Sequence, residues 1–174
     1  AGRVSSLPHA PVVWWEDNKI KSFSAVPGEY VMRYAGGKTI SVKLSSPDTF
    51  CIENVTGTLS FSSSYPVDIK SIEITRLASW SESTDPAIKY FSGTGTYHLK
   101  FSVPEEYLTG NDSVLLSLGE IGSTARVTLN NQHLGYVWNP FIMLPVRGVL
   151  SKENELEVEV NNVYRNRIIG DYIE

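Results

Sequence analysis

The segment 125–138, ARVTLNNQHLGYVW, is typical of a β-hairpin. Its middle is Asn130-Asn131, and asparagine is the residue other than glycine that best tolerates the positive φ angles of a tight hairpin turn. Polar and apolar residues alternate before that turn, as in a strand with one buried face. The apolar positions of the two arms are Val127, Leu129 and Leu134. We therefore predict two antiparallel strands joined by a two-residue turn.

Segments of the same kind recur along most of the chain, separated by Gly, Pro, Asn and Ser. The clearest is GTYHLKFSV at 95–103, because successive side chains of a strand point to opposite faces. Its apolar face holds Tyr97, Leu99, Phe101 and Val103. Gly36-Gly37 predicts a second hairpin, Gly57 is expected to turn or kink its segment, and one helical turn is expected at 104–108. Many short strands with turn signals predict an all-β sandwich or barrel.

The composition is that of an ordinary globular protein. The chain has 174 residues, of which 41% are hydrophobic and 20% charged, and its net charge is −4. A weakly acidic chain lacks the concentrated basic face that nucleic acid requires, and no apolar run is long enough to span a membrane. The single cysteine, Cys51, excludes an intrachain disulfide and is expected to be a small buried residue.

The chain divides in composition near the Ser/Pro stretch 44–50. Residues 1–47 contain few predicted strands and too few apolar residues for a core of their own. We therefore expect a short β segment from the edge of a preceding domain. Residues 48–174 are long enough for an eight-stranded jelly roll. Because the chain begins without methionine or a signal peptide, we expect a processed product or an excised segment.

Two short motifs resemble phosphate-binding loops, but the residues that follow them do not fit such a loop. AGGKT at 35–39 ends like a phosphate-binding loop, and SGTGT at 92–96 contains Gly-x-Gly. Each is followed by a strand pattern, whereas phosphate binding needs a helix whose N-terminus holds the anion. Glycosidase chemistry needs two facing carboxylates, and most acids here read as solvated surface groups. Glu120, in the tight turn LGEIGS, is the exception that we keep as a candidate.

Two tryptophans beside polar residues are candidates for sugar binding: Trp80 in LASWSES, and Trp138 followed by Asn139. An indole ring can stack on the apolar face of a sugar while amides and carboxylates bind its hydroxyls. The alternative is that both rings are partly buried core residues with a satisfied indole N–H, which is the commoner role of large aromatics.

No Cys/His spacing indicates zinc. A structural calcium ion is possible in a jelly roll, held by carboxylate and backbone oxygens, although no contiguous acidic loop identifies its site. The possible carboxylate ligands are Asp48, Glu53, Asp68 and Glu155.

From about Leu77 onward the order of motifs resembles the galactose-binding-like jelly-roll module of glycoside hydrolases. Those motifs are the SW loop, IKYFSGTGTY, the hairpin pattern A.V.LN followed by LG, the strand N.L.V.V.N and the ending NRIIGD. The chain is similar to the sugar-binding domain of family 2, and more so to the C-terminal β-sandwich of bacterial family 106 α-L-rhamnosidase-like enzymes. That family usually has Gly where Asn131 stands.

The resemblance implies a non-catalytic antiparallel β-sandwich, because in that family the catalytic carboxylates lie in a separate barrel domain that no part of this chain resembles. The expected role is to brace the catalytic domain of a secreted or periplasmic bacterial hydrolase, or to contact its carbohydrate. The alternatives are an autonomous carbohydrate-binding module and, further off, a small free-standing glycosidase. The expected partners are thus an oligo- or polysaccharide and the catalytic domain of the parent chain.

The C-terminal segment 161–174, NNVYRNRIIGDYIE, packs charged and apolar residues together. Its Arg165 and Asn166 are candidates for a sugar site. We favour a structural clasp instead, in which Asp171 pairs with Arg165 or Arg167, and then Arg167→Ala should lower the thermal stability.

Overall fold

The structure is a computed structural model that describes residues 12–16, 19–23, 27–33, 36–45, 48–52, 55–62, 71–110 and 113–162. The chain forms two compact units, Ala1–Cys51 and Ile52–Glu174. The sequence predicts a boundary after residue 47, whereas the two units of the structure divide between Cys51 and Ile52. None of the described helices is long and apolar enough to cross a membrane.

In the part of the first unit that the structure describes, the strands form two antiparallel pairs. One joins β1 (Val12–Glu16) to β2 (Lys19–Phe23), and the other joins β3 (Gly28–Arg33) to β4 (Thr39–Leu44). The predicted hairpin is confirmed, with Gly37 at a φ of 79° in its turn. Cys51 is exposed, so the prediction of a buried cysteine is wrong.

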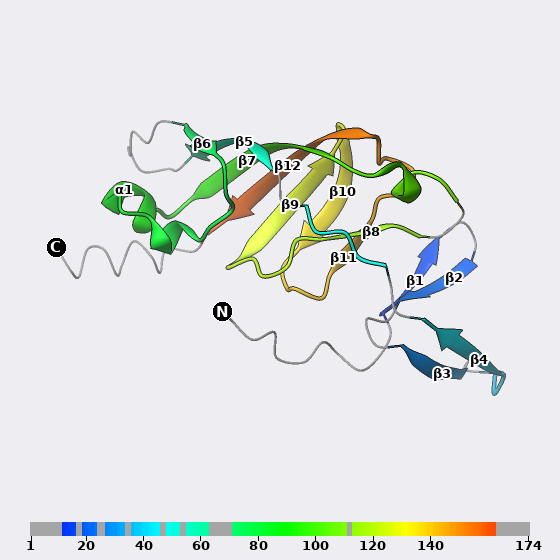
Figure 1. Cartoon of the computed structure of the whole chain (residues 1–174). Helices are drawn as coiled ribbons and strands as arrows, with labels where there is room; N and C mark the ends of the chain where they lie inside the picture. The colour runs from blue at the N-terminus through cyan, green and yellow to red at the C-terminus, as the bar shows by residue number, and fades with distance from the viewer. Residues whose placement is uncertain are drawn as a thin grey trace. The chain divides into compact units, whose positions relative to one another are not determined.

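The second unit is an antiparallel β-sandwich (Figure 1). Its larger layer is a six-stranded sheet in the order β10-β9-β12-β7-β5-β6, and its smaller layer is the pair β11-β8. The strands are β5 (Thr56–Ser62), β6 (Ile72–Ile74), β7 (Thr94–Ser102), β8 (Leu115–Ser117), β9 (Thr124–Leu129), β10 (Gln132–Val137), β11 (Met143–Pro145) and β12 (Glu153–Asn161). The prediction of an all-β antiparallel sandwich is confirmed.

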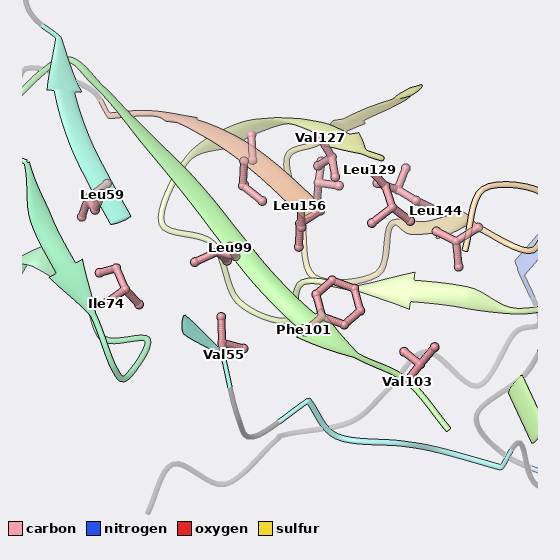
Figure 2. Packing of buried hydrophobic residues seen from close by; sticks show 14 residues of the cluster. Val55, Leu59, Ile74, Leu99, Phe101, Val103, Val127, Leu129, Leu144 and Leu156 are labelled. Carbon is pink, nitrogen blue, oxygen red and sulfur yellow. The ribbon is translucent and has the colours of Figure 1, made fainter. Parts of the chain in front are cut away.

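The core lies against one face of the six-stranded sheet. Leu99 and Phe101 of β7 and Val103, which follows it, are buried, and Tyr97 is half-buried, so the predicted apolar face is confirmed. Figure 2 shows this row meeting apolar side chains from β9 and β12 and Leu144 of β11. The sheet therefore has one apolar face and one face left to solvent, as its alternating strands require.

Among the described residues, three short helical elements lie in the connections: η1 (Trp80–Glu82), α1 (Pro86–Lys89) and η2 (Glu105–Tyr107). The turn expected at 104–108 is confirmed as η2, a 3-10 helix. The helix α1 is not among the elements predicted from the sequence, although its start carries ordinary helix signals. Asp85 caps it by accepting a hydrogen bond from Ala87 N at 2.9 Å, and proline stands at its first position.

The expected kink at Gly57 is wrong. Gly57 lies inside β5, where it pairs with Ile74 of β6 on one side and Leu99 of β7 on the other. A Cβ atom added there would stand 1.9 Å from the carbonyl oxygen of His98. Glycine is therefore required by the close approach of a neighbouring backbone, and not by a turn.

The hairpin predicted at Asn130-Asn131 is confirmed: φ is 48° at Asn130 and 65° at Asn131, and the two residues join β9 to β10. The Asn130 side chain also makes three hydrogen bonds. Its Nδ2 donates to Val149 O at 2.8 Å and to Asn154 Oδ1 at 3.0 Å, and its Oδ1 accepts from Glu155 N at 2.9 Å.

Asn154 extends this arrangement and is only 2% exposed. Its Oδ1 accepts from Ser151 N at 2.9 Å and its Nδ2 donates to Ser151 O at 2.6 Å. Buried amides are tolerated when their polar atoms are paired, as they are here. We call Asn130 and Asn154 the amide pair, which ties the hairpin turn to the start of β12.

Candidate functional site

The path of β10 is set by a β-bulge. The register with β9 shifts between His133 and Gly135, so Leu134 is the extra residue. An extra residue reverses which side chains face the core in the rest of a strand. As a result Val137 is buried, while Tyr136 is exposed. Gly135 has a φ of 143°, which few residues other than glycine adopt.

The bulge exposes a group of aromatic side chains along β10 and the loop after it. Trp138 is 63% exposed, Tyr136 56% and Phe141 43%. His133 and Tyr136 form an edge-to-face pair with ring centroids 5.3 Å apart. We call His133, Tyr136, Trp138 and Phe141 the aromatic patch.

Hydrogen bonds fix the loop that carries Trp138 and Phe141. Asn139 Oδ1 accepts from Phe141 N at 2.9 Å, and Asn139 O accepts from Ile142 N at 3.3 Å. Ile142 packs against the core. A sugar-binding role for Asn139 therefore has to leave its carboxamide oxygen in the turn.

Trp80 lies in a different setting, half-buried over β7. Its Nε1 donates to Tyr97 Oη at 2.6 Å, and its ring meets Phe61 and Phe91 edge-to-face, with centroids 5.4 and 5.7 Å away. A Cβ atom on Gly95 would lie 2.3 Å from Trp80 Cζ2, so the glycine makes room for the indole. These contacts are those of a residue that closes the core.

A matched pair of substitutions separates the two tryptophans. We expect Trp80→Phe to lower the free energy of unfolding by about 1 kcal/mol or more, since it removes a hydrogen bond and ring contacts from a half-buried site. Trp138→Phe should change the free energy of unfolding by less than about 0.5 kcal/mol, as is usual for exposed positions. Urea denaturation followed by circular dichroism measures both. Equal losses would contradict these different settings.

The pKa of Tyr97 is raised above its usual value of 10.0, because burial disfavours the phenolate more than the Trp80 hydrogen bond favours it. The unfolded chain then loses this proton at a lower pH than the folded chain does. The stabilising contribution is complete below pH 10.0 and is lost as the pH rises through the raised pKa. Absorbance titration should show one tyrosine that ionises late and is missing from Tyr97→Phe; identical late portions of the two curves would disprove this assignment.

The strand register brings several candidates to the same end of the sheet. Ala125 pairs with Val137 and with Val160, so the loop that holds Glu120 and the loop that holds Trp138 leave the sheet at that end. Glu120 is exposed. Trp80, over Gly95, also lies at this end, but β7 and β10 are three strand spacings apart, about 14 Å. Arg165 and Asn166 lie outside the described residues.

The outer face of β12 carries four glutamates at alternate positions, each with a neighbour on an adjacent strand. Glu153 accepts from Ser102 Oγ at 2.9 Å, and Glu155 pairs with Lys100 at 2.9 Å. Glu157 lies 3.5 Å from His98 Nδ1, and Glu159 pairs with Arg126. Cross-strand pairs of this kind are usual on the solvent-exposed face of a sheet.

No metal centre is visible among the residues that the structure describes, where no three His, Cys, Asp or Glu side chains gather. Of the possible calcium ligands, Glu155 is paired with Lys100 and Asp48 is exposed. Glu53 and Asp68 lie outside the described residues.

The antiparallel strands of the 52–174 unit thus form a β-sandwich module. Residues 60–168 match the family model of the glycosyl hydrolase 2 galactose-binding domain-like proteins, and the chain belongs to this family. The predicted resemblance to the galactose-binding-like module of glycoside hydrolases is thereby confirmed.

The relatives are much longer than this chain. A protein of Formosa agariphila, to which a beta-glucuronidase activity is provisionally attributed, is 33% identical over 92% of this chain, which spans only 14% of that protein. A rhamnosidase from Novosphingobium sp. PP1Y matches in structure with a TM-score of 0.63 and 27% identity, over 88% of this chain and 16% of its own. A Ruminococcus gnavus glucuronidase solved with D-glucuronic acid shares the fold, with a TM-score of 0.51 and 16% identity over 68% of this chain and 23% of its own.

Proposed function

We propose that this chain is a non-catalytic module of a larger bacterial glycoside hydrolase, which braces the catalytic domain or contacts the carbohydrate. Membership in the galactose-binding domain-like family supports the connection with carbohydrate-degrading enzymes. The small share of each relative that the chain spans supports a longer parent protein.

The arrangement of the acids is the observation that carries the non-catalytic role. The two carboxyl groups of a glycosidase face each other across the scissile bond and are about 5 to 10 Å apart. Alternate residues of one strand are about 7 Å apart, so spacing alone would admit a pair such as Glu157 and Glu159. Both, however, project from one side of a sheet and are engaged with His98 and Arg126, so they cannot flank a substrate.

The parent enzyme is proposed to remove side chains from plant or host polysaccharides, with a rhamnoside as the first substrate to test and a glucuronide as the second. The similarity to the rhamnosidase supports the first of these substrates, and the similarity to the Formosa agariphila protein supports the second. We place the parent enzyme outside the cytoplasm, in the periplasm or secreted, where polysaccharides are degraded. Cell fractionation with an antibody against this module tests the location, and a purely cytoplasmic signal would refute it.

Autonomous carbohydrate binding is the second candidate, and the exposure of Trp138 is the observation that favours it. Calorimetry of the 174-residue chain against monosaccharides and pectic oligosaccharides tests it. Millimolar or tighter binding that Trp138→Ala abolishes, and that Leu77→Ala at another exposed position retains, would establish this candidate. An absence of heat with every ligand would leave the bracing role.

A further inference from the structure

We propose that the aromatic patch is the face through which this module docks against the catalytic domain of its own parent chain. The inference rests on the proposed function and assigns its contact surface. Trp138, Tyr136 and Phe141 are three exposed aromatic side chains within six residues of the chain, and exposed apolar groups of this kind often mark an interaction site. Tyrosine, tryptophan and phenylalanine are also the residues that protein interfaces favour.

The polar groups around the patch favour a protein surface over a sugar. A sugar needs several free donors and acceptors beside the ring on which it stacks. Here Asn139 Oδ1 is engaged by Phe141 N, and Arg126, which pairs across the strands with Tyr136, is held by Glu159. Phe141 offers no polar atom. Two of the polar groups beside the rings are thus engaged within this chain, and the exposed rings supply a largely apolar surface, which suits a protein partner.

The patch is also built in advance. The bulge at Gly135 sets the direction of Tyr136, and the Asn139 turn fixes the loop with Phe141. Little backbone freedom is then lost on docking, which strengthens an interface. The same bulge interrupts the regular edge of β10, so contact through the side chains is favoured over addition of a strand.

The catalytic domain is the favoured occupant because the relatives carry this module within much longer chains. This chain spans only 14% of the Formosa agariphila protein and 16% of the Novosphingobium rhamnosidase chain. A domain on the same polypeptide is present at a high effective concentration, so even a small patch can hold it.

Hydroxyl-radical footprinting of the 174-residue chain and of the full-length parent protein tests the proposal. Oxidation of Tyr136, Trp138 and Phe141 should be roughly five-fold slower in the parent, since docking would bring Trp138 from 63% exposure to that of a core residue. Leu77, which is 53% exposed on the same unit, serves as the control and should react alike in both proteins. In the parent, the double substitution Tyr136→Ser, Trp138→Ser should return Phe141 to the faster rate, whereas Leu77→Ser should not.

Three results would overturn the proposal. Equal oxidation of the patch in both proteins would mean that nothing in the parent covers it. Protection in the 174-residue chain that grows with protein concentration would assign the patch to a second copy, and protection by pectic oligosaccharides would assign it to sugar. A parent without glycosidase activity would instead refute the proposed function, whatever the footprint shows.

Discussion

Replacing Gly57 by alanine should lower the free energy of unfolding of the 52–174 unit by at least about 3 kcal/mol, the upper part of the range for overpacking. The added Cβ would stand 1.9 Å from His98 O and 3.0 Å from Leu99 Cα. Both are backbone atoms, so no rotation of a side chain can relieve the clash. Either β5 separates from β7, or the centre of the sheet shifts.

The control for this substitution is Gly122→Ala. A Cβ at Gly122 would meet nothing within 4 Å. The free energy of unfolding of this variant should therefore lie within about 0.5 kcal/mol of that of the unsubstituted chain. Urea denaturation followed by far-ultraviolet circular dichroism measures both variants. If Gly57→Ala were as stable as Gly122→Ala, β5 would not lie against β7 as described.

Replacing Asn130 by glycine should cost about 3 kcal/mol of unfolding free energy, even though glycine adopts the φ of 48° without strain. The substitution removes three side-chain hydrogen bonds and leaves groups such as Val149 O and the amide of the buried Asn154 without that partner. Each net bond is worth about 1 kcal/mol, and an unpaired buried group costs more.

The neighbouring residue provides the control. Asn131 is exposed and also has a positive φ, of 65°, so Asn131→Gly should be neutral or slightly stabilising. Thermal and urea denaturation of both variants make the comparison. Should the two glycine variants prove equally stable, the amide pair would contribute nothing beyond the turn.

The hairpin could be predicted from sequence because all its signals are local. Asn130-Asn131 is flanked by alternating strands, and a two-residue turn follows directly from that pattern. Gly57 could not be interpreted in the same way, since its requirement comes from His98 on a strand that lies far away in the sequence. A glycine inside a strand signals either a bend or a close approach, and sequence alone does not distinguish them.

The candidate site was only half predictable for a similar reason. If β10 alternated regularly from the core-packed Leu134, Tyr136 and Trp138 would face the core and Val137 would be exposed. The bulge reverses this order. The sequence indicates Trp138 as a candidate but not Tyr136, and Gly135 is the one signal in the sequence that could have indicated the bulge.

The motifs that carried the family resemblance turn out to hold structural residues. Asn130 lies in the A.V.LN pattern, Gly135 in the LG pair that follows, and Asn154 begins the N.L.V.V.N strand. Asn130 and Asn154 form the amide pair, and Gly135 lies at the bulge of β10. Such a motif reports the fold because it fixes hydrogen bonds and backbone geometry, and it does not by itself report a catalytic or sugar site.

Hydrolysis of aryl glycosides tests the central claim most directly, with 4-nitrophenyl α-L-rhamnoside and β-D-glucuronide offered to the 174-residue chain and to the full-length parent at equal molar concentration. We expect the parent to release nitrophenol from one of them and the 174-residue chain to release none above the rate without protein. Turnover by the 174-residue chain alone, lost on substitution of a glutamate such as Glu120 or Glu157, would contradict the account.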